Sequence, residues 1–288
     1  MTPDEKDSDL SQSLGMFEAA VKPQALKLAA TKTECTLTVF DGSNQDATTK
    51  ALGEAVAERL GSCLVTKTFE GTASRDARET VDLILIEAQN TKAGLIVLDA
   101  PFGEDIGSLE MESLGSVIDL LIEEPGPPLL IARHPIADAA AGLADSVLIV
   151  SWRERLQGAA ASWAAAIAKG GGRVEMIAVP DPYLLSEIRA ILGDDEGAKL
   201  TEDLMHRAET RLAGGLVSAM QQASDIDGFS VSFRVAQGAA VQRTTVDLIG
   251  DSGRLAIVAY AKGVDPVSRG RARDIILASR GPVLAIGV

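Results

Sequence analysis

The sequence has few of the residue types on which most catalytic and metal-binding sites depend. Among its 288 residues are two histidines, His134 and His206, and two cysteines, Cys35 and Cys63. Neither histidine lies in a cluster with metal-ligand spacing, and no Ser/His/Asp or Cys/His arrangement is recognisable. Both cysteines lie in apolar, strand-like segments, so we expect buried free thiols in a reducing cytosol. The sequence therefore indicates no catalytic residue and no metal site.

Aromatic residues and positive charge are also scarce. Aromatics make up 3% of the chain, and the formal net charge is −14. A chain of this charge repels the phosphate backbone, so we expect no nucleic-acid partner. No apolar run is long enough to span a membrane, and Met1–Met16 is acidic and polar, unlike a signal peptide. We therefore expect a cytoplasmic protein without a membrane partner.

The stretch Ala93–Arg133 shows most clearly how the chain is built. The apolar run Leu95–Leu98 predicts a strand buried on both faces, and a helix-period segment follows it. A second apolar run, Leu129–Ala132, predicts another strand, which makes a crossover unit of a parallel sheet. Ligands of such sheets bind beyond the carboxyl ends of the strands, so the loop Pro101–Gly107 is the first candidate site.

Taken in order, the chain predicts two α/β halves. We expect a tail with a helix over Phe17–Ala30, and then a shortened first domain of four strands. A small, Ala-rich linker leads to a complete second domain of five strands. The predicted boundaries are 1–33 for the tail and helix, 34–133 for the first domain, 134–144 for the linker and 145–288 for the second domain.

A repeated motif supports this division. The seven residues Arg78–Ile84 read RETVDLI, and Arg243–Ile249 read RTTVDLI. Each copy precedes an apolar strand, a helix and a strand that follows Gly-Pro. Agreement over so many consecutive elements indicates a duplication. We expect the two copies to form separate parallel sheets that pair through their last strands, Leu129–Ala132 and Val283–Ile286, or through those strands with another chain.

The order of elements in both halves resembles the universal stress protein family. Local features add to the resemblance: an Asp-Gly-Ser turn after the first strand (Asp41, Gly42, Ser43), a Gly-bearing loop after Leu95–Leu98, and Gly115-Ser116 at the start of a helix. The resemblance covers about residues 34–133 and 145–288. It implies Rossmann-like α/β domains, dimer-like pairing through the last strands and, in one subgroup, ATP bound between the first-strand turn and the Gly-bearing loop.

The ATP-binding signature of that subgroup, G-x2-G-x9-G-[ST], is incomplete here. Anchored on Gly115-Ser116, its first two glycines correspond to Phe102 and Asp105, while Gly103 and Gly107 are displaced. Glycines let backbone N–H groups approach phosphates, whereas bulk and negative charge oppose them. The resemblance thus offers these candidate nucleotide-binding residues, with ATP weakly bound or not bound: Asp41, Gly42, Ser43, Gly103, Gly107, Gly115 and Ser116.

The second half departs further from the signature. Its first strand ends without an Asp, and Arg269-Gly270 stand in place of Gly-Ser. Basic residues gather at the start of this helix, namely Lys262, Arg269, Arg271 and Arg273. They offer partners to an anion, or they are solvated charges at a helix end.

Three functions follow from these observations. The first is a non-enzymatic stress-response or regulatory module that acts through dimerisation and an unidentified protein partner, with weak or no ATP binding. The second is an ATP- or AMP-binding stress protein that uses the first-half pocket, with slow hydrolysis. The third is a small-molecule enzyme on the same scaffold, for which we find no nucleophile or base. The broken glycine signature favours the first.

Overall fold

The computed structural model describes residues 26–31, 33–43, 46–69, 75–103, 113–150, 154–178, 190–191, 193, 199, 213–235, 253–263 and 266–288. Within these ranges strands and helices alternate, as expected for an α/β protein. The strands are β1 (Cys35–Phe40), β2 (Cys63–Thr68), β3 (Ala93–Asp99), β4 (Leu129–Ala132), β5 (Asp145–Val150), β6 (Arg173–Ala178), β7 (Ser230–Val235), β8 (Leu255–Tyr260) and β9 (Val283–Gly287). The helices are α2 (Asp46–Leu60), α3 (Ala77–Asn90), α4 (Ser116–Glu123), α5 (Ala139–Ala144), α6 (Glu154–Ala168), the π-helix η3 (Ala213–Val217), α9 (Ser218–Asp227) and α11 (Pro266–Ala278).

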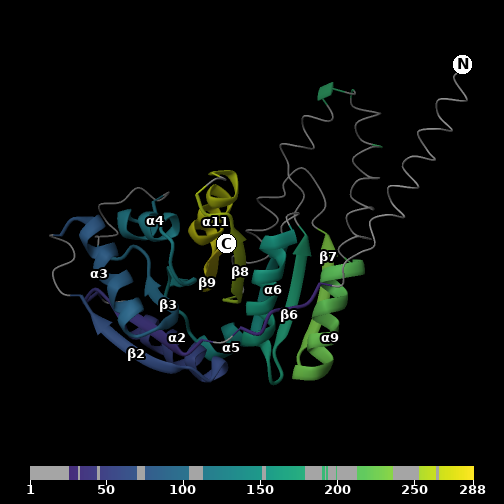
Figure 1. The fold of residues 1–288 in the computed structure, drawn as a ribbon, viewed down its shortest axis with the longest axis horizontal. Helices are drawn as coiled ribbons and strands as arrows, with labels where there is room; N and C mark the ends of the chain where they lie inside the picture. The colour runs from purple at the N-terminus through teal and green to yellow at the C-terminus, as the bar shows by residue number, and fades with distance from the viewer. Residues whose placement is uncertain are drawn as a thin grey trace, which may run out of the picture.

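All nine strands form one sheet, in the order β2-β1-β3-β4-β9-β8-β5-β6-β7. The α/β fold is therefore confirmed, but the expectation of two separate parallel sheets is wrong. Neighbouring strands run parallel except at the centre, where β4 pairs with β9 in the antiparallel sense. There Leu129 lies opposite Ala285 and Leu130 opposite Leu284. The predicted pairing of the two last strands thus occurs within one chain, and this pairing merges the sheets (Figure 1).

The strand order mirrors itself about the β4–β9 joint. From the joint outward, the first half runs β4, β3, β1, β2 and the second half runs β9, β8, β5, β6, with β7 added. The register agrees: Ile96 of β3 lies opposite Leu129, and Ala256 of β8 lies opposite Val283. The second half has one strand more than the first, as the sequence predicts.

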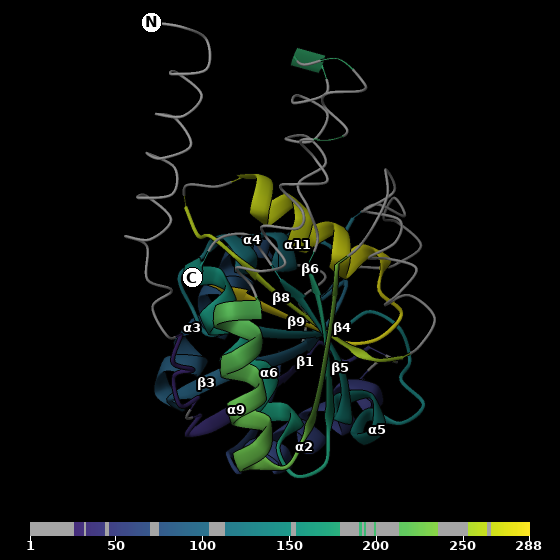
Figure 2. The same ribbon diagram turned by 90° about the vertical axis from the view of Figure 1, so that its right-hand side faces the viewer.

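Helices cover both faces of the sheet, so the central strands are buried on both sides (Figures 1 and 2). One core cluster joins α3, α4 and α11 to the sheet, with Ile84, Ile118 and Ile275 among its members. The other core cluster joins α2, α5, α6 and α9 to the opposite face. The run Leu95–Leu98 is fully buried, as its uninterrupted apolar pattern predicts.

Two local predictions are wrong. Residues 26–30 are not helical, because the Ala29 N–H donates to Ser162 Oγ at 3.1 Å and Leu26 packs against α6. The predicted linker contains the helix α5, whose first turn is capped by Asp138, and Leu143 is buried in the core. The second copy of the repeated motif, Arg243–Ile249, lies outside the described residues.

The expectation of free, buried cysteines is also wrong. Cys35 and Cys63 lie opposite each other in the β1–β2 pair and form a disulfide, with a Cα–Cα distance of 4.4 Å. β2 is an edge strand of the described sheet, and Cys63 is exposed. Disulfides persist in oxidising surroundings, so this bond removes the argument for a reducing cytosol. In the described part of the chain, the helices are too short or too polar to cross a bilayer.

Candidate functional site

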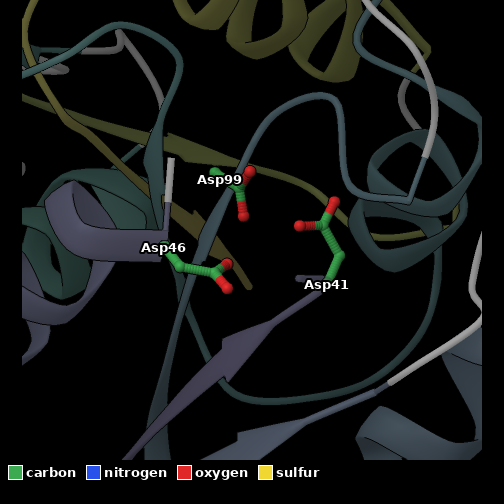
Figure 3. A group of neighbouring side chains, drawn as sticks. All are labelled: Asp41, Asp46 and Asp99. Atoms are coloured by element: carbon green, nitrogen blue, oxygen red, sulfur yellow. The ribbon is translucent and has the colours of Figure 1, made fainter. Parts of the chain in front are cut away.

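Three carboxylates meet where the adjacent strands β1 and β3 end. Asp41 directly follows β1, Asp99 is the last residue of β3, and Asp46 is the first residue of α2. One carboxylate oxygen from each lies within 4.8 Å of the others. Figure 3 shows the three side chains turned toward a common space. This is the edge of the sheet at which parallel α/β folds bind ligands.

Asp41 is held by two backbone N–H groups. The Ser43 N–H donates to Asp41 Oδ1 at 2.8 Å, which closes the turn that Gly42 makes with a φ of 84°. The Gly103 N–H donates to Asp41 Oδ2 at 2.7 Å. These bonds fix the Asp41 carboxylate between the loop after β1 and the loop after β3.

Asp99 is the most buried member of the cluster. Its side chain is 1% exposed, and its Oδ2 accepts a hydrogen bond from Ser43 Oγ at 3.2 Å. Its other oxygen, Oδ1, is buried without a hydrogen-bond partner. Burial and the negative charges of Asp41 and Asp46 together raise the Asp99 pKa to about 7, against the opposing effect of a backbone hydrogen bond and of the Ser43 hydrogen bond. No Lys or Arg of the described segments is among the groups that act on this pKa.

Asp46 completes the cluster from the first turn of α2. Burial and the charge of Asp41 raise its pKa, whereas backbone hydrogen bonds from Asp41 and Gly42 lower it. Its Oδ1 is also buried without a hydrogen-bond partner. Asp46 is the first residue of α2 and contributes its charge to the cluster.

The structure brings together only part of the predicted nucleotide site. Asp41, Ser43 and Gly103 are linked by hydrogen bonds, and Gly42 makes the turn between the first two. The Gly103 N–H thus donates to a carboxylate, whereas the resemblance implies that it would face a phosphate. Phe102, which the signature alignment puts in place of a glycine, is fully buried in the core.

The remaining candidates begin α4. Gly115 precedes the helix with a φ of 88°, and its N–H donates to Ser113 Oγ at 3.2 Å. Ser116 is the first residue of α4 and is exposed. Gly107 and Asp105 lie outside the described residues. The N–H at Gly115 is therefore already used within its own loop.

The basic residues of the second half contact the first half. Arg269 pairs with Glu123 at 3.0 Å and Arg273 with Asp119 at 3.1 Å, both across the gap between α11 and α4. Lys262 Nζ donates to the backbone oxygen of Gly126 at 2.9 Å. The two arginine pairs line a pocket of about 370 Å³ between these helices. These cations support the joint between the halves, and a partly exposed pair of this kind contributes at most about 1 kcal/mol.

Asp46 and Asp99 are the site residues that the sequence reasoning missed. A signal for Asp99 was present, since it directly follows the buried run Leu95–Leu98 and thus ends the central strand of its half. The candidate loop Pro101–Gly107 starts two residues after Asp99. Only the adjacency of β1 and β3 brings Asp99 to Asp41, 58 positions away in sequence.

Comparisons with known proteins do not place the chain in a family. No family model matches it, and no curated protein matches it. A solved structure named "putative aspartate carbamoyltransferase", from Leishmania major Friedlin, aligns with 97% of this chain and 78% of its own, at 10% identity and a TM-score of 0.23. A similarity of this size carries no argument about function.

Proposed function

We propose that this chain is a regulatory module of the universal stress protein kind, non-enzymatic, in which both halves of a dimer are contained in one polypeptide. The observation that carries the proposal is the strand order, which mirrors itself about the antiparallel β4–β9 pair. In the family that the sequence resembles, two separate domains pair in this way. Here the joint buries apolar side chains from both halves, including Leu130 and Leu284, both fully buried.

The first-half site favours weak or absent ATP binding. A bound triphosphate needs N–H donors or cations to offset the loss of its hydration. At the carboxyl ends of β1 and β3 the chain instead presents Asp41, Asp46 and Asp99, and the Gly103 N–H is taken by Asp41. The residual attraction of a helix N-terminus is about 0.3–1 kcal/mol, too little to balance these charges.

Function would then reside in the surfaces that bind a partner protein. Such a partner would bind the exposed edge strand β2 or the acidic surface of the chain. The inner strands are not open to it, because each already pairs with a neighbour on both sides. Binding of ATP or AMP with slow hydrolysis is the alternative that the test must separate from this proposal.

Two measurements on the purified full-length chain test the proposal. Light scattering should give the mass of one chain, because each half already covers the last strand of the other. A mass of two chains would contradict a self-contained pair. Nucleotide released by heat denaturation should be far below one equivalent per chain, whereas a stoichiometric yield of ATP or AMP would favour the alternative.

A further inference from the structure

We propose that Asp41, Asp46 and Asp99 bind one hard divalent cation, of the Mg²⁺ and Ca²⁺ class, at the carboxyl ends of β1 and β3. The proposal does not depend on the regulatory function, because it concerns the cation without nucleotide or partner. It rests on the geometry of the three carboxylates, on the burial of Asp99 and on the kind of ligand atoms present (Figure 3).

The separations of the carboxylate oxygens suit a shared cation. Ca²⁺ binds oxygens at about 2.3–2.6 Å, so two ligands on opposite sides of the ion lie about 4.6–5.2 Å apart. Mg²⁺ binds at about 2.1 Å, which gives about 4.2 Å. The three oxygens lie within 4.8 Å of one another. Separations of this size are compatible with one Ca²⁺ shared by the three carboxylates, and Mg²⁺ requires a closer approach.

The burial of Asp99 distinguishes this cluster from a group of acidic side chains on the surface. A carboxylate with 1% exposure has lost its water, and one of its oxygens has no hydrogen-bond partner. Burying such a group without compensation is costly, and a bound cation would remove the cost.

The ligand set also indicates the class of metal. All three ligands are carboxylates, which prefer hard cations such as Mg²⁺, Ca²⁺ and Mn²⁺ over softer metals. Asp41 is oriented by the Ser43 and Gly103 N–H groups, so its carboxylate is held in place before a cation arrives. An ionised carboxylate has about four lone-pair positions, so these two bonds leave room for a metal.

The second half provides an internal comparison. The Ile96 N–H donates to the Pro128 oxygen as the Ala256 N–H donates to the Pro282 oxygen, so Ile96 matches Ala256 and Asp99 corresponds to Ala259. Ala259 is 7% exposed, so a small apolar side chain stands where the first half has its buried carboxylate. The cation site therefore belongs to the first half alone, and one site per chain is expected.

Mn²⁺ is a suitable probe, because the electron paramagnetic resonance signal of the free ion disappears on binding. The full-length chain is freed of metal with EDTA, desalted and titrated with MnCl₂ at pH 8, without nucleotide. We expect one saturable Mn²⁺ per chain, displaced by Mg²⁺ or Ca²⁺. Asp99→Asn and Asp46→Asn should each weaken Mn²⁺ binding by at least about tenfold, as expected on loss of a ligand.

Two matched variants serve as controls. Asp274→Asn removes an exposed carboxylate on α11 and makes the net charge less negative by the same amount, and Tyr260→Phe changes a buried polar residue at the carboxyl end of β8. Both should bind Mn²⁺ like the wild type, and circular dichroism checks that every variant is folded. The proposal is overturned if the wild type shows no saturable site up to about 5 mM Mn²⁺. It is also overturned if folded Asp99→Asn and Asp46→Asn bind as tightly as the wild type.

Discussion

Replacing Asp99 by Asn should change how the stability of the chain depends on pH. Asp99 is 1% exposed, and burial together with the charges of Asp41 and Asp46 raises its pKa from 3.8 to about 7. Asn has nearly the same shape and carries no charge, so Asp99→Asn removes the titration and keeps the packing. The Ser43 hydroxyl, which donates to Asp99 Oδ2, still has an acceptor if the amide oxygen takes that position.

The size of the effect follows from the two pKa values. The folded chain binds the Asp99 proton below pH 7, whereas the unfolded chain releases it above about pH 4. A raised pKa of this kind stabilises the fold at low pH, and the contribution is lost as pH rises through 7. Between about pH 4 and pH 7, each rise of one pH unit lowers the free energy of unfolding by about 1.4 kcal/mol. From pH 5 to pH 8 the wild type should therefore lose about 2.5 kcal/mol that Asp99→Asn retains.

Urea unfolding followed by circular dichroism at pH 5 and pH 8, in EDTA, measures this difference. All other titrating groups are shared by the two proteins, so their contributions cancel when the wild type is compared with the variant. Asp274→Asn, at an exposed position, should follow the wild type. The reasoning fails if wild type and Asp99→Asn lose the same stability between the two pH values.

Two further predictions concern the strands of the first half and the helix α2 that packs on them. Reducing the Cys35–Cys63 disulfide, which closes a loop of 28 residues, should lower the free energy of unfolding by about 3–4 kcal/mol; equal urea midpoints with and without dithiothreitol would contradict it. Gly53→Ala should cost about 1–3 kcal/mol, because the new methyl would lie 2.1 Å from the hydroxyl oxygen of buried Thr38. The matched variant Gly270→Ala meets no atom within 4 Å and should change stability by less than about 1 kcal/mol, so equal losses in the two would refute the close contact.

The elements that the sequence predicted well are those whose own residues determine them. The bounds of β4, Leu129–Ala132, agree with the prediction to the residue, and the predicted strand Leu95–Leu98 lies within β3. Both have an unbroken apolar run, bordered by turn residues. The pairing of β4 with β9 was also predictable, because both strands are apolar and each ends its copy of the duplication.

The errors concern features that depend on register between distant segments. The disulfide requires that β1 lie beside β2 with Cys35 opposite Cys63, and neither local sequence contains that information. The acidic cluster likewise forms only because β1 and β3 are neighbours, which brings Asp41 and Asp99 to the same edge. A duplication suggests two independent sheets. Here the pairing of β4 with β9 joins the two halves into one sheet.

A calorimetric titration of ATP into the metal-free full-length chain, run once in EDTA and once with excess Mg²⁺, tests the regulatory proposal most directly. The buried Asp99, its two carboxylate neighbours and the occupied Gly103 N–H predict that neither titration gives a dissociation constant as tight as the low micromolar range. The Mg²⁺ arm matters most, because a cation held by the cluster would reduce the repulsion of the phosphates. A dissociation constant at or below the low micromolar range in either arm would contradict the account and would identify the chain as an ATP-binding protein.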